Sequence, residues 1–470
     1  MPSTRRRFLA GCALAAGPTV AGCSDDTDPA PELEETLTPV EVPRSDREIL
    51  AEAADLDAPS IPSAIVVTDD HLEAAATEVE SAIAEVEDLN AEADRDQVDV
   101  DVPDAADVEW RVHAAGEVVE DVRSDGPSRD GLSSLRQVLE DMGELRGILR
   151  TVTGRTDLGA IQEAIDRQRG DERDLRHGID YRIAEPVGEH LPTRRAAWET
   201  LATLDGLQDA AELLDGADQD AEQHPRRIGD IERVRVRHER RLDDAERWLE
   251  TSSDPGAPPI ADGIAAELVA LHEEAERIGA EHAGEDDAGD SLADRIDAVR
   301  VRIGRRGVRI AEELDGLVDE LDGRADDGDA FESTGDGDGE DAGALARVRG
   351  VETLLNGLEW LVEYEAVDVA AERTIDQVGD REFPTPEVLE AKRRAVERIE
   401  HVAGASPIER HLARRSTVVL DHGDGHPRRD VADLEAVAYA HFVYTAAAEW
   451  ADRGAASGGR LSDRLQAEQS

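Results

Sequence analysis

The segment Ile264-Ala-Ala-Glu-Leu268-Val-Ala-Leu271-His-Glu-Glu-Ala275-Glu-Arg-Ile278 decides the fold class. Its numbered apolar residues recur at alternating steps of four and three, which is the spacing of the buried stripe on an amphipathic helix. Charged side chains occupy many of the positions between them. The same spacing is typical of the seam along which the helices of a bundle or coiled coil pack. The segment therefore predicts a helix that buries one face against other helices.

The same periodicity extends through most of the chain, with further apolar stripes beginning at Leu72, Leu292 and Ile310. Strand signals are scarce. We therefore predict an all-α fold, an elongated antiparallel helical bundle or coiled-coil-like body that can divide into two helical subdomains. The predicted helices span residues 69–93, 104–123, 129–152, 157–184, 193–215, 225–251, 260–283, 289–323, 343–379, 385–403, 406–420 and 428–453.

Composition and turn residues divide the chain into six parts. Four prolines between residues 29 and 43 favour an extended stalk, and four glycines among acids between residues 328 and 339 favour a loop. The predicted parts are a signal peptide (1–22), a lipidated, acidic and proline-rich stalk (23–68), a helical bundle (69–322), an acidic glycine-rich loop (323–343), a second helical subdomain (344–455) and a disordered tail (456–470).

The charge balance limits the function classes. The chain has 110 Asp or Glu against 52 Lys or Arg and a formal net charge of -58, so nucleic-acid phosphates would meet a like-charged surface. Nucleic acid is therefore not an expected partner. A mean hydropathy of -0.51 argues against a protein with several membrane spans. The acidic, lysine-poor composition resembles that of proteins from salt-loving archaea, in whose molar salt the Debye length falls to ~3 Å.

The N-terminus has the order of an export signal. Residues 4–9 (TRRRFL) resemble the twin-arginine motif, and residues 20–23 (VAGC) resemble a lipobox. The signal region as a whole resembles that of twin-arginine-exported lipoproteins of halophilic archaea. The resemblance implies that Arg5, Arg6, Phe8 and Leu9 engage the export machinery and that Cys23 carries the lipid. It also implies that the protein is exported and anchored to the outer face of the cell membrane through this lipid.

Catalytic and metal-binding motifs are missing from the sequence. None of the 13 histidines follows a glutamate by three residues, which a di-iron bundle requires, and no Gly-x-Ser-x-Gly nucleophile motif occurs. His422 and His426 stand in a glycine-broken stretch ending in Pro427, which favours an ordinary polar loop over a metal site. We therefore predict no metal, no cofactor and no enzymatic activity.

Two arginine-rich segments depart from the acidic background. Residues 226–241 contain seven arginines against three acids, and residues 300–309 contain five arginines and no acid. Such stripes could bind an anionic ligand or partner, or could form ion pairs with neighbouring helices. The abundance of acids favours ion pairs. The candidate surface residues are Arg233, Arg237, Arg241, Arg302, Arg306 and Arg309.

Aromatic residues gather near the C-terminus. Tyr439, Phe442 and Trp450 fall near one stripe of a predicted helix, and Trp360 lies on an earlier helix. Core packing is the favoured interpretation, and an aromatic-lined ligand pocket is the alternative.

These observations lead to a ranked set of functional hypotheses. The first is a non-catalytic, lipid-anchored cell-envelope protein whose helices form a scaffold for self-association or for an unknown protein partner. The alternative is a ligand-binding lipoprotein that serves a transporter or a sensor. An enzyme of unknown class is the third.

Overall fold

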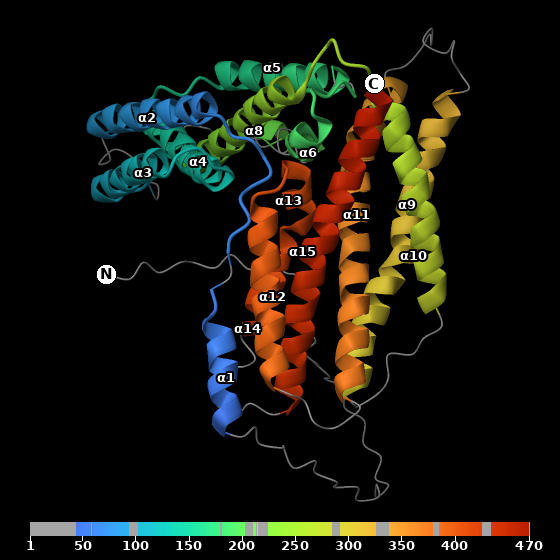
Figure 1. Cartoon of the computed structure of the whole chain (residues 1–470). Helices are drawn as coiled ribbons and strands as arrows, with labels where there is room; N and C mark the ends of the chain where they lie inside the picture. The colour runs from blue at the N-terminus through green and yellow to red at the C-terminus, as the bar shows by residue number, and fades with distance from the viewer. Residues whose placement is uncertain are drawn as a thin grey trace, which may run out of the picture. The chain divides into compact units, whose positions relative to one another are not determined.

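The described part of the chain is built from α-helices, and the all-α prediction is confirmed (Figure 1). The structure, a computed structural model, describes residues 44–57, 59–93, 102–178, 181–202, 210–212, 214, 224–283, 292–325, 338–378, 385–424 and 434–469. Within these residues there is no strand, only an isolated antiparallel bridge between Ile183 and Ser253. The helices are α1 Arg44–Asp55, α2 Asp69–Glu92, α3 Ala105–Asp125, α4 Arg129–Val152, α5 Leu158–His177, α6 Val187–Ala202, α8 Pro225–Ser252, α9 Ala261–His282, α10 Leu292–Ala325, α11 Asp338–Val378, α12 Thr385–Ala403, α13 Pro407–Ala413, α14 Arg415–Asp424 and α15 Leu434–Gln469.

Side-chain caps explain where several helices begin. The side chains of Thr68, Asp104, Ser128 and Asp157 each accept a hydrogen bond from a backbone N–H three residues later. These bonds satisfy amides that have no partner within the helix. Gly126 ends α3 with a positive φ of 80°, a conformation that favours glycine. Local sequence therefore sets these boundaries, which lie within two residues of those predicted.

The helices pack in antiparallel pairs and small groups. α4 packs against α2 and α8, and α9 packs against α10. α15 lies beside α11 and α12 and also contacts α13 and α14 (Figure 1). Glycine allows the closest of these approaches, because a Cβ on Gly147 of α4 would stand 2.8 Å from the carbonyl oxygen of Ile228 in α8.

The hydrophobic core crosses the subdomain boundary predicted at residues 323–343. Ile278 of α9 and Ile303 of α10 share a core cluster with Trp360 of α11 and Phe442 of α15. Because α9 and α10 bury their apolar stripes against α11, no subdomain ends between them, and that predicted division is wrong. α10 continues to Ala325 and α11 begins at Asp338, so both helices extend into the predicted loop, whose residues 326–337 lie outside the described part.

The predicted stalk contains a packed helix. Within the segment 23–68, α1 buries Leu50 and Ala53 in a cluster with Val388 and Ile399 of α12. The upstream prolines and acids suggested an extended chain, but the short apolar stripe of α1 finds a partner helix. The predicted signal peptide 1–22, and with it Arg5, Arg6, Phe8, Leu9 and Cys23, lies outside the described residues.

The predicted disordered tail, residues 456–470, is wrong. α15 continues through it to Gln469, whose side-chain amide donates to the backbone oxygen of Ile183 at 3.0 Å. Leu461 and Leu465 are buried in the main core cluster. Gly458 allows close contact with α13, since a Cβ there would stand 2.8 Å from the backbone of Glu409. Among the described helices, none is both long enough and apolar enough to cross a membrane.

Candidate functional site

The first arginine-rich segment forms ion pairs across the α4–α8 interface. Arg237 Nη2 lies 2.7 Å from Glu140 Oε2, and Arg233 Nη1 lies 3.3 Å from Glu144 Oε2. Arg241 is half-buried near Glu140, and burial together with the charge of Arg237 lowers its pKa. These arginines face the acids of the neighbouring helix, as the favoured interpretation predicted.

The second arginine-rich segment divides between two environments. Arg306 of α10 contacts Glu363 of α11, with Nη1 3.0 Å from Oε2. Arg302 and Arg309 are exposed, and neither forms an ion pair with a residue that the structure describes. Val308 lies beside Arg309 with 44% of its surface exposed. This face of α10 therefore presents cations to solvent.

The predicted aromatic residues are packing residues. Trp360, Phe442 and Trp450 are each at most 3% exposed, and Tyr439 packs against the cluster that contains Trp360. The indole N–H of Trp360 donates to the carbonyl oxygen of Ile303 at 2.9 Å, and that of Trp450 donates to Leu412 at 3.1 Å. Buried indoles with satisfied N–H groups fit the core-packing interpretation.

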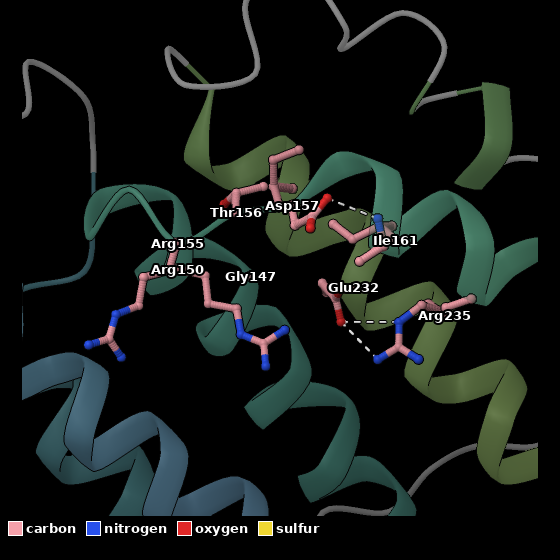
Figure 2. Close-up of a pocket in the computed structure, with 11 residues that line it drawn as sticks. Gly147, Arg150, Arg155, Thr156, Asp157, Ile161, Glu232 and Arg235 are labelled. Atoms are coloured by element: carbon pink, nitrogen blue, oxygen red, sulfur yellow. Dashed lines mark hydrogen bonds and ion pairs between the residues drawn. The ribbon is translucent and has the colours of Figure 1, made fainter.

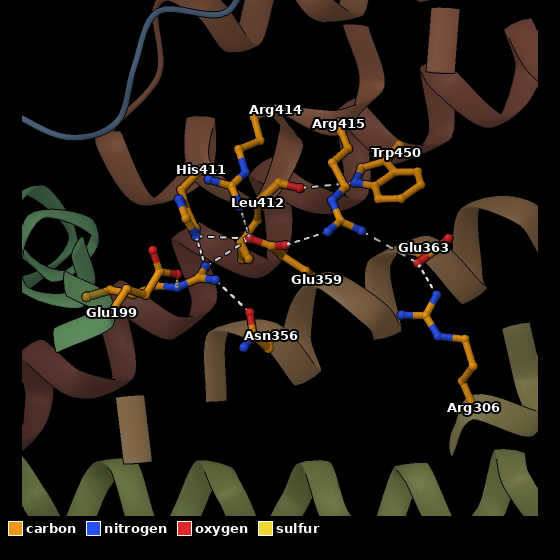
Figure 3. Close-up of polar contacts among 11 residues, drawn as sticks. Glu199, Arg306, Asn356, Glu359, Glu363, His411, Leu412, Arg414, Arg415 and Trp450 are labelled. Carbon is orange, nitrogen blue, oxygen red and sulfur yellow. Dashed lines mark hydrogen bonds and ion pairs between the residues drawn. The ribbon is translucent and has the colours of Figure 1, made fainter. Parts of the chain in front are cut away.

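A buried polar cluster around Glu359 joins α6, α11 and α13 (Figure 3). Three groups approach Glu359 Oε1: Arg195 Nη1 at 3.0 Å, His411 Nε2 at 3.1 Å and Arg414 Nη2 at 3.0 Å. Arg415 Nη2 lies 3.7 Å from Glu359 Oε2. The residues come from distant parts of the chain with no motif spacing, so the sequence did not reveal the cluster.

Burial and neighbouring charges shift the pKa values of residues in this cluster. Burial opposes ionisation of Glu359, but the hydrogen bond from His411 and the charges of Arg414 and Arg195 outweigh it and lower its pKa. Burial lowers the pKa of His411 to about 4, so the imidazole is neutral at neutral pH. Glu359 and His411 are buried, with 4% and 3% of their surfaces exposed, respectively. The cluster is therefore suited to holding helices together.

A cavity of about 200 Å³ opens between the end of α4, the start of α5 and α8 (Figure 2). Arg150 and Arg155 lie on one side of it, and Arg235 with Glu232 lies on the other. Its lining residues are Gly147, Arg150, Arg155, Thr156, Asp157, Ala160, Ile161, Ala164, Ile228, Glu232 and Arg235. The arginine-rich segment did not reveal the cavity, because Arg150 comes from α4 and Arg155 from the α4–α5 connection.

Glu232 forms the polar floor of this cavity and is 2% exposed. It accepts hydrogen bonds from Arg235 Nη2 at 3.0 Å and from Arg146 Nη2 at 3.2 Å. Burial would raise the pKa of Glu232, but Arg235 and Arg146 outweigh burial and leave that pKa lowered. The floor is therefore a neutralised ion network rather than an unpaired negative charge.

A larger groove, about 530 Å³ in volume, lies among α9, α10, α11 and Arg453 of α15. Half of its lining residues are acidic. Its arginines pair with these carboxylates, such as Arg277 with Glu274 at 2.6 Å and Arg453 with Glu365 at 2.6 Å. An acid-rich groove is the expected surface of this composition and selects no particular ligand.

One tryptophan departs from the others. Trp198, Trp248, Trp360 and Trp450 are at most 3% exposed, whereas Trp110 of α3 is 68% exposed. α3 packs against α2 and α4 and turns its other face to solvent. The sequence held a signal for this, because Trp110 lies between Glu109 and Arg111 and off the stripe of Val108, Val112 and Ala115.

Among the residues that the structure describes, no group of three or more His, Cys, Asp or Glu is placed to hold a metal ion. Comparison of the chain with protein-family models, with curated proteins and with solved structures found no match.

Proposed function

We propose that the protein is a non-catalytic, lipid-anchored cell-envelope protein whose helical body is a scaffold for a protein partner. The observation that supports the scaffold is the exposure of Trp110, at 68%, in a chain that buries its other four tryptophans. An indole left in water forfeits about 2 kcal/mol of burial free energy. Exposed tryptophans are also enriched among the residues that dominate binding at protein interfaces.

The surroundings of Trp110 indicate the chemistry of the partner. Asp107 and Glu117 lie one to two turns away on α3 and are exposed, and Glu117 pairs with exposed His113 at 3.5 Å. A partner that covers this face would offer an apolar pocket for the indole and a basic rim for the acids.

Photo-crosslinking tests the scaffold. A photoreactive residue at position 110 is expected to give a discrete crosslinked protein in native membranes at molar salt. The same residue at position 269 is the control, because Val269 is 40% exposed on a different helix, α9. Trp110→Ala should abolish co-purification of the crosslinked protein, and sedimentation of the purified chain shows whether it is a second copy. Equal crosslinking at both positions, or none at either, would contradict the proposal.

Anchoring and export rest on the sequence signals alone and have their own test. Cys23→Ser is expected to release the protein from membranes. Replacing Arg5 and Arg6 together by lysine should retain it inside the cell. Normal membrane fractionation of both variants contradicts the anchoring proposal but leaves the scaffold untouched.

The proposed salty medium predicts a salt-dependent fold. With a net charge of -58, the chain should give a helix-rich circular dichroism spectrum in molar salt that is lost on dilution, as screening of the acids disappears. Full helicity in dilute buffer would contradict this part of the proposal.

A further inference from the structure

We propose that the cavity between α4, α5 and α8 is a binding site for a small organic anion, a carboxylate with a compact apolar body. The inference stands apart from the proposed scaffold, because the cavity lies on other helices than α3.

The first argument is the local excess of cations. Three arginines line the cavity against two acids, in a chain where acids outnumber bases 110 to 52. Of the two acids, Glu232 is already neutralised by Arg146 and Arg235, and Asp157 Oδ1 accepts the backbone N–H of Ala160 at 3.0 Å. The lining of the cavity is therefore richer in cations than the chain as a whole, which favours an anion over a cation as its ligand.

The second argument is that outer carboxylates hold Arg150 and Arg155 in place and leave some of their N–H donors unused. A guanidinium has five N–H donors. Arg150 uses Nε and Nη2 on Glu85, and Arg155 uses Nη2 on Glu92. Neither Glu85 nor Glu92 lines the cavity. These outer carboxylates fix the side chains, so less conformational entropy is lost when their remaining N–H groups bind a carboxylate.

The third argument is the apolar wall, which indicates an organic anion. Ala160, Ile161, Ala164 and Ile228 line the cavity together with the arginines. An apolar cavity of about 150 Å³ holds benzene. The volume here, about 200 Å³, is therefore sufficient for a molecule of the size of benzoate. Chloride at molar concentration competes for the cations but gains nothing from the apolar wall.

The test is isothermal titration calorimetry in molar potassium chloride with benzoate, neutral benzamide and sulfate. Benzoate should bind saturably, and benzamide and sulfate should bind at least tenfold more weakly. Arg155→Gln should weaken benzoate binding by tenfold or more, as expected for loss of a charged hydrogen bond. Ala164→Phe should block binding by filling the cavity.

The control variant is Arg277→Gln, which removes an exposed arginine with similar ion pairs on α9. It should bind benzoate like the wild type. Arg155 is 55% exposed, so Arg155→Gln should fold normally, and thermal melting of every variant checks this. The proposal is overturned if benzamide or sulfate binds as tightly as benzoate. It is also overturned if benzoate binding does not saturate by about 0.1 M, a concentration well above a millimolar Kd. Equal loss of benzoate affinity in Arg155→Gln and Arg277→Gln would overturn it as well.

Discussion

α8 and α10 carry the two arginine-rich segments, and the structure uses them differently. In α8, Arg233 and Arg237 pair with acids of α4. In α10, Arg306 pairs with Glu363, while Arg302 and Arg309 are exposed without an ion pair among the described residues. Arginine content alone therefore does not distinguish an interhelical ladder from a solvent-facing stripe.

The difference comes from the facing helix. α4 and α8 run antiparallel, so Glu140 meets Arg237 and Glu144 meets Arg233, four residues apart on both helices. Residues four apart lie on one face of a helix, which brings both pairs into register. On α10, Arg302 and Arg309 are exposed, and neither pairs with an acid whose side chain the structure describes.

The largest effect is expected from Glu232→Gln, which breaks the buried centre of the α4–α8 interface. The change removes the buried carboxylate that Arg146 and Arg235 share, and should lower the free energy of unfolding by about 4 kcal/mol. Chemical denaturation at molar salt measures this. Glu239→Gln is the matched control, because Glu239 pairs with the same Arg235 but is 47% exposed. Similar losses in both variants would contradict the distinction.

The second prediction concerns the pH dependence of stability and the Glu359 cluster. Arg306 of α10 pairs with Glu363, which lies next to this cluster. The folded protein keeps His411 neutral down to its pKa of about 4, whereas an unfolded chain protonates it near 6.5. Between these values the unfolded state binds more protons, so the free energy of unfolding falls as pH falls. The free energy of unfolding is undiminished by this effect above pH 6.5, and it falls by about 3 kcal/mol between pH 6.5 and pH 4.

Denaturation at pH 7 and pH 5 checks the prediction. His411→Gln keeps a hydrogen-bond donor for Glu359 and should show a smaller loss between these pH values than the wild type. His113→Gln, which replaces a histidine whose side chain is 76% exposed, is the control. An unchanged pH dependence in His411→Gln would contradict the assignment.

The third prediction tests the close approach of α4 and α8. An alanine at position 147 would place Cβ 2.8 Å from Ile228 O and 2.9 Å from Gly229 Cα, so the helices must move apart. Gly147→Ala should cost about 2 kcal/mol of unfolding free energy. Gly116→Ala meets no atom within 4 Å and should stabilise by up to about 1 kcal/mol through helix propensity. A stabilising Gly147→Ala would refute the contact.

The smallest effects are expected from the partly or fully exposed arginines of α8 and α10. Replacing Arg233 and Arg237 together by glutamine should cost about 1 kcal/mol, because two interhelical pairs are lost. Replacing Arg302 and Arg309 together should change the unfolding free energy by less than about 0.5 kcal/mol. Equal losses in the two double variants would show that the α10 stripe is not free on the protein surface.

The sequence predicted helices better than it predicted their partners. The stripe from Ile264 to Ile278 forms α9 over Ala261–His282, because a four-and-three periodicity is a local property of the chain. Residues 456–470 were predicted to be a disordered tail, but 456–469 form the end of α15, where the small size of Gly458 allows contact with α13. A glycine can end a helix or allow two helices to pack closely, and only the neighbouring helix distinguishes these two roles.

The candidate sites were less predictable for the same reason. The Glu359 cluster brings together Arg195 and His411, which are 216 residues apart in sequence. The cavity combines Arg155 of the α4–α5 connection with Arg235 of α8. Neither set of residues has a characteristic spacing in the sequence. Neither site could therefore be predicted without knowing how the helices pack.

The contact between Gln469 and Ile183 has a consequence for synthesis of the chain. The two residues are separated by 286 positions, and Leu461 and Leu465 complete the same core. A ribosome that has not yet translated α15 carries a nascent chain whose earlier helices still expose the apolar faces that α15 covers. Acquisition of the native state must therefore wait for translation of α15, and until then the unfinished polypeptide depends on chaperones or on its own charge repulsion to avoid aggregation.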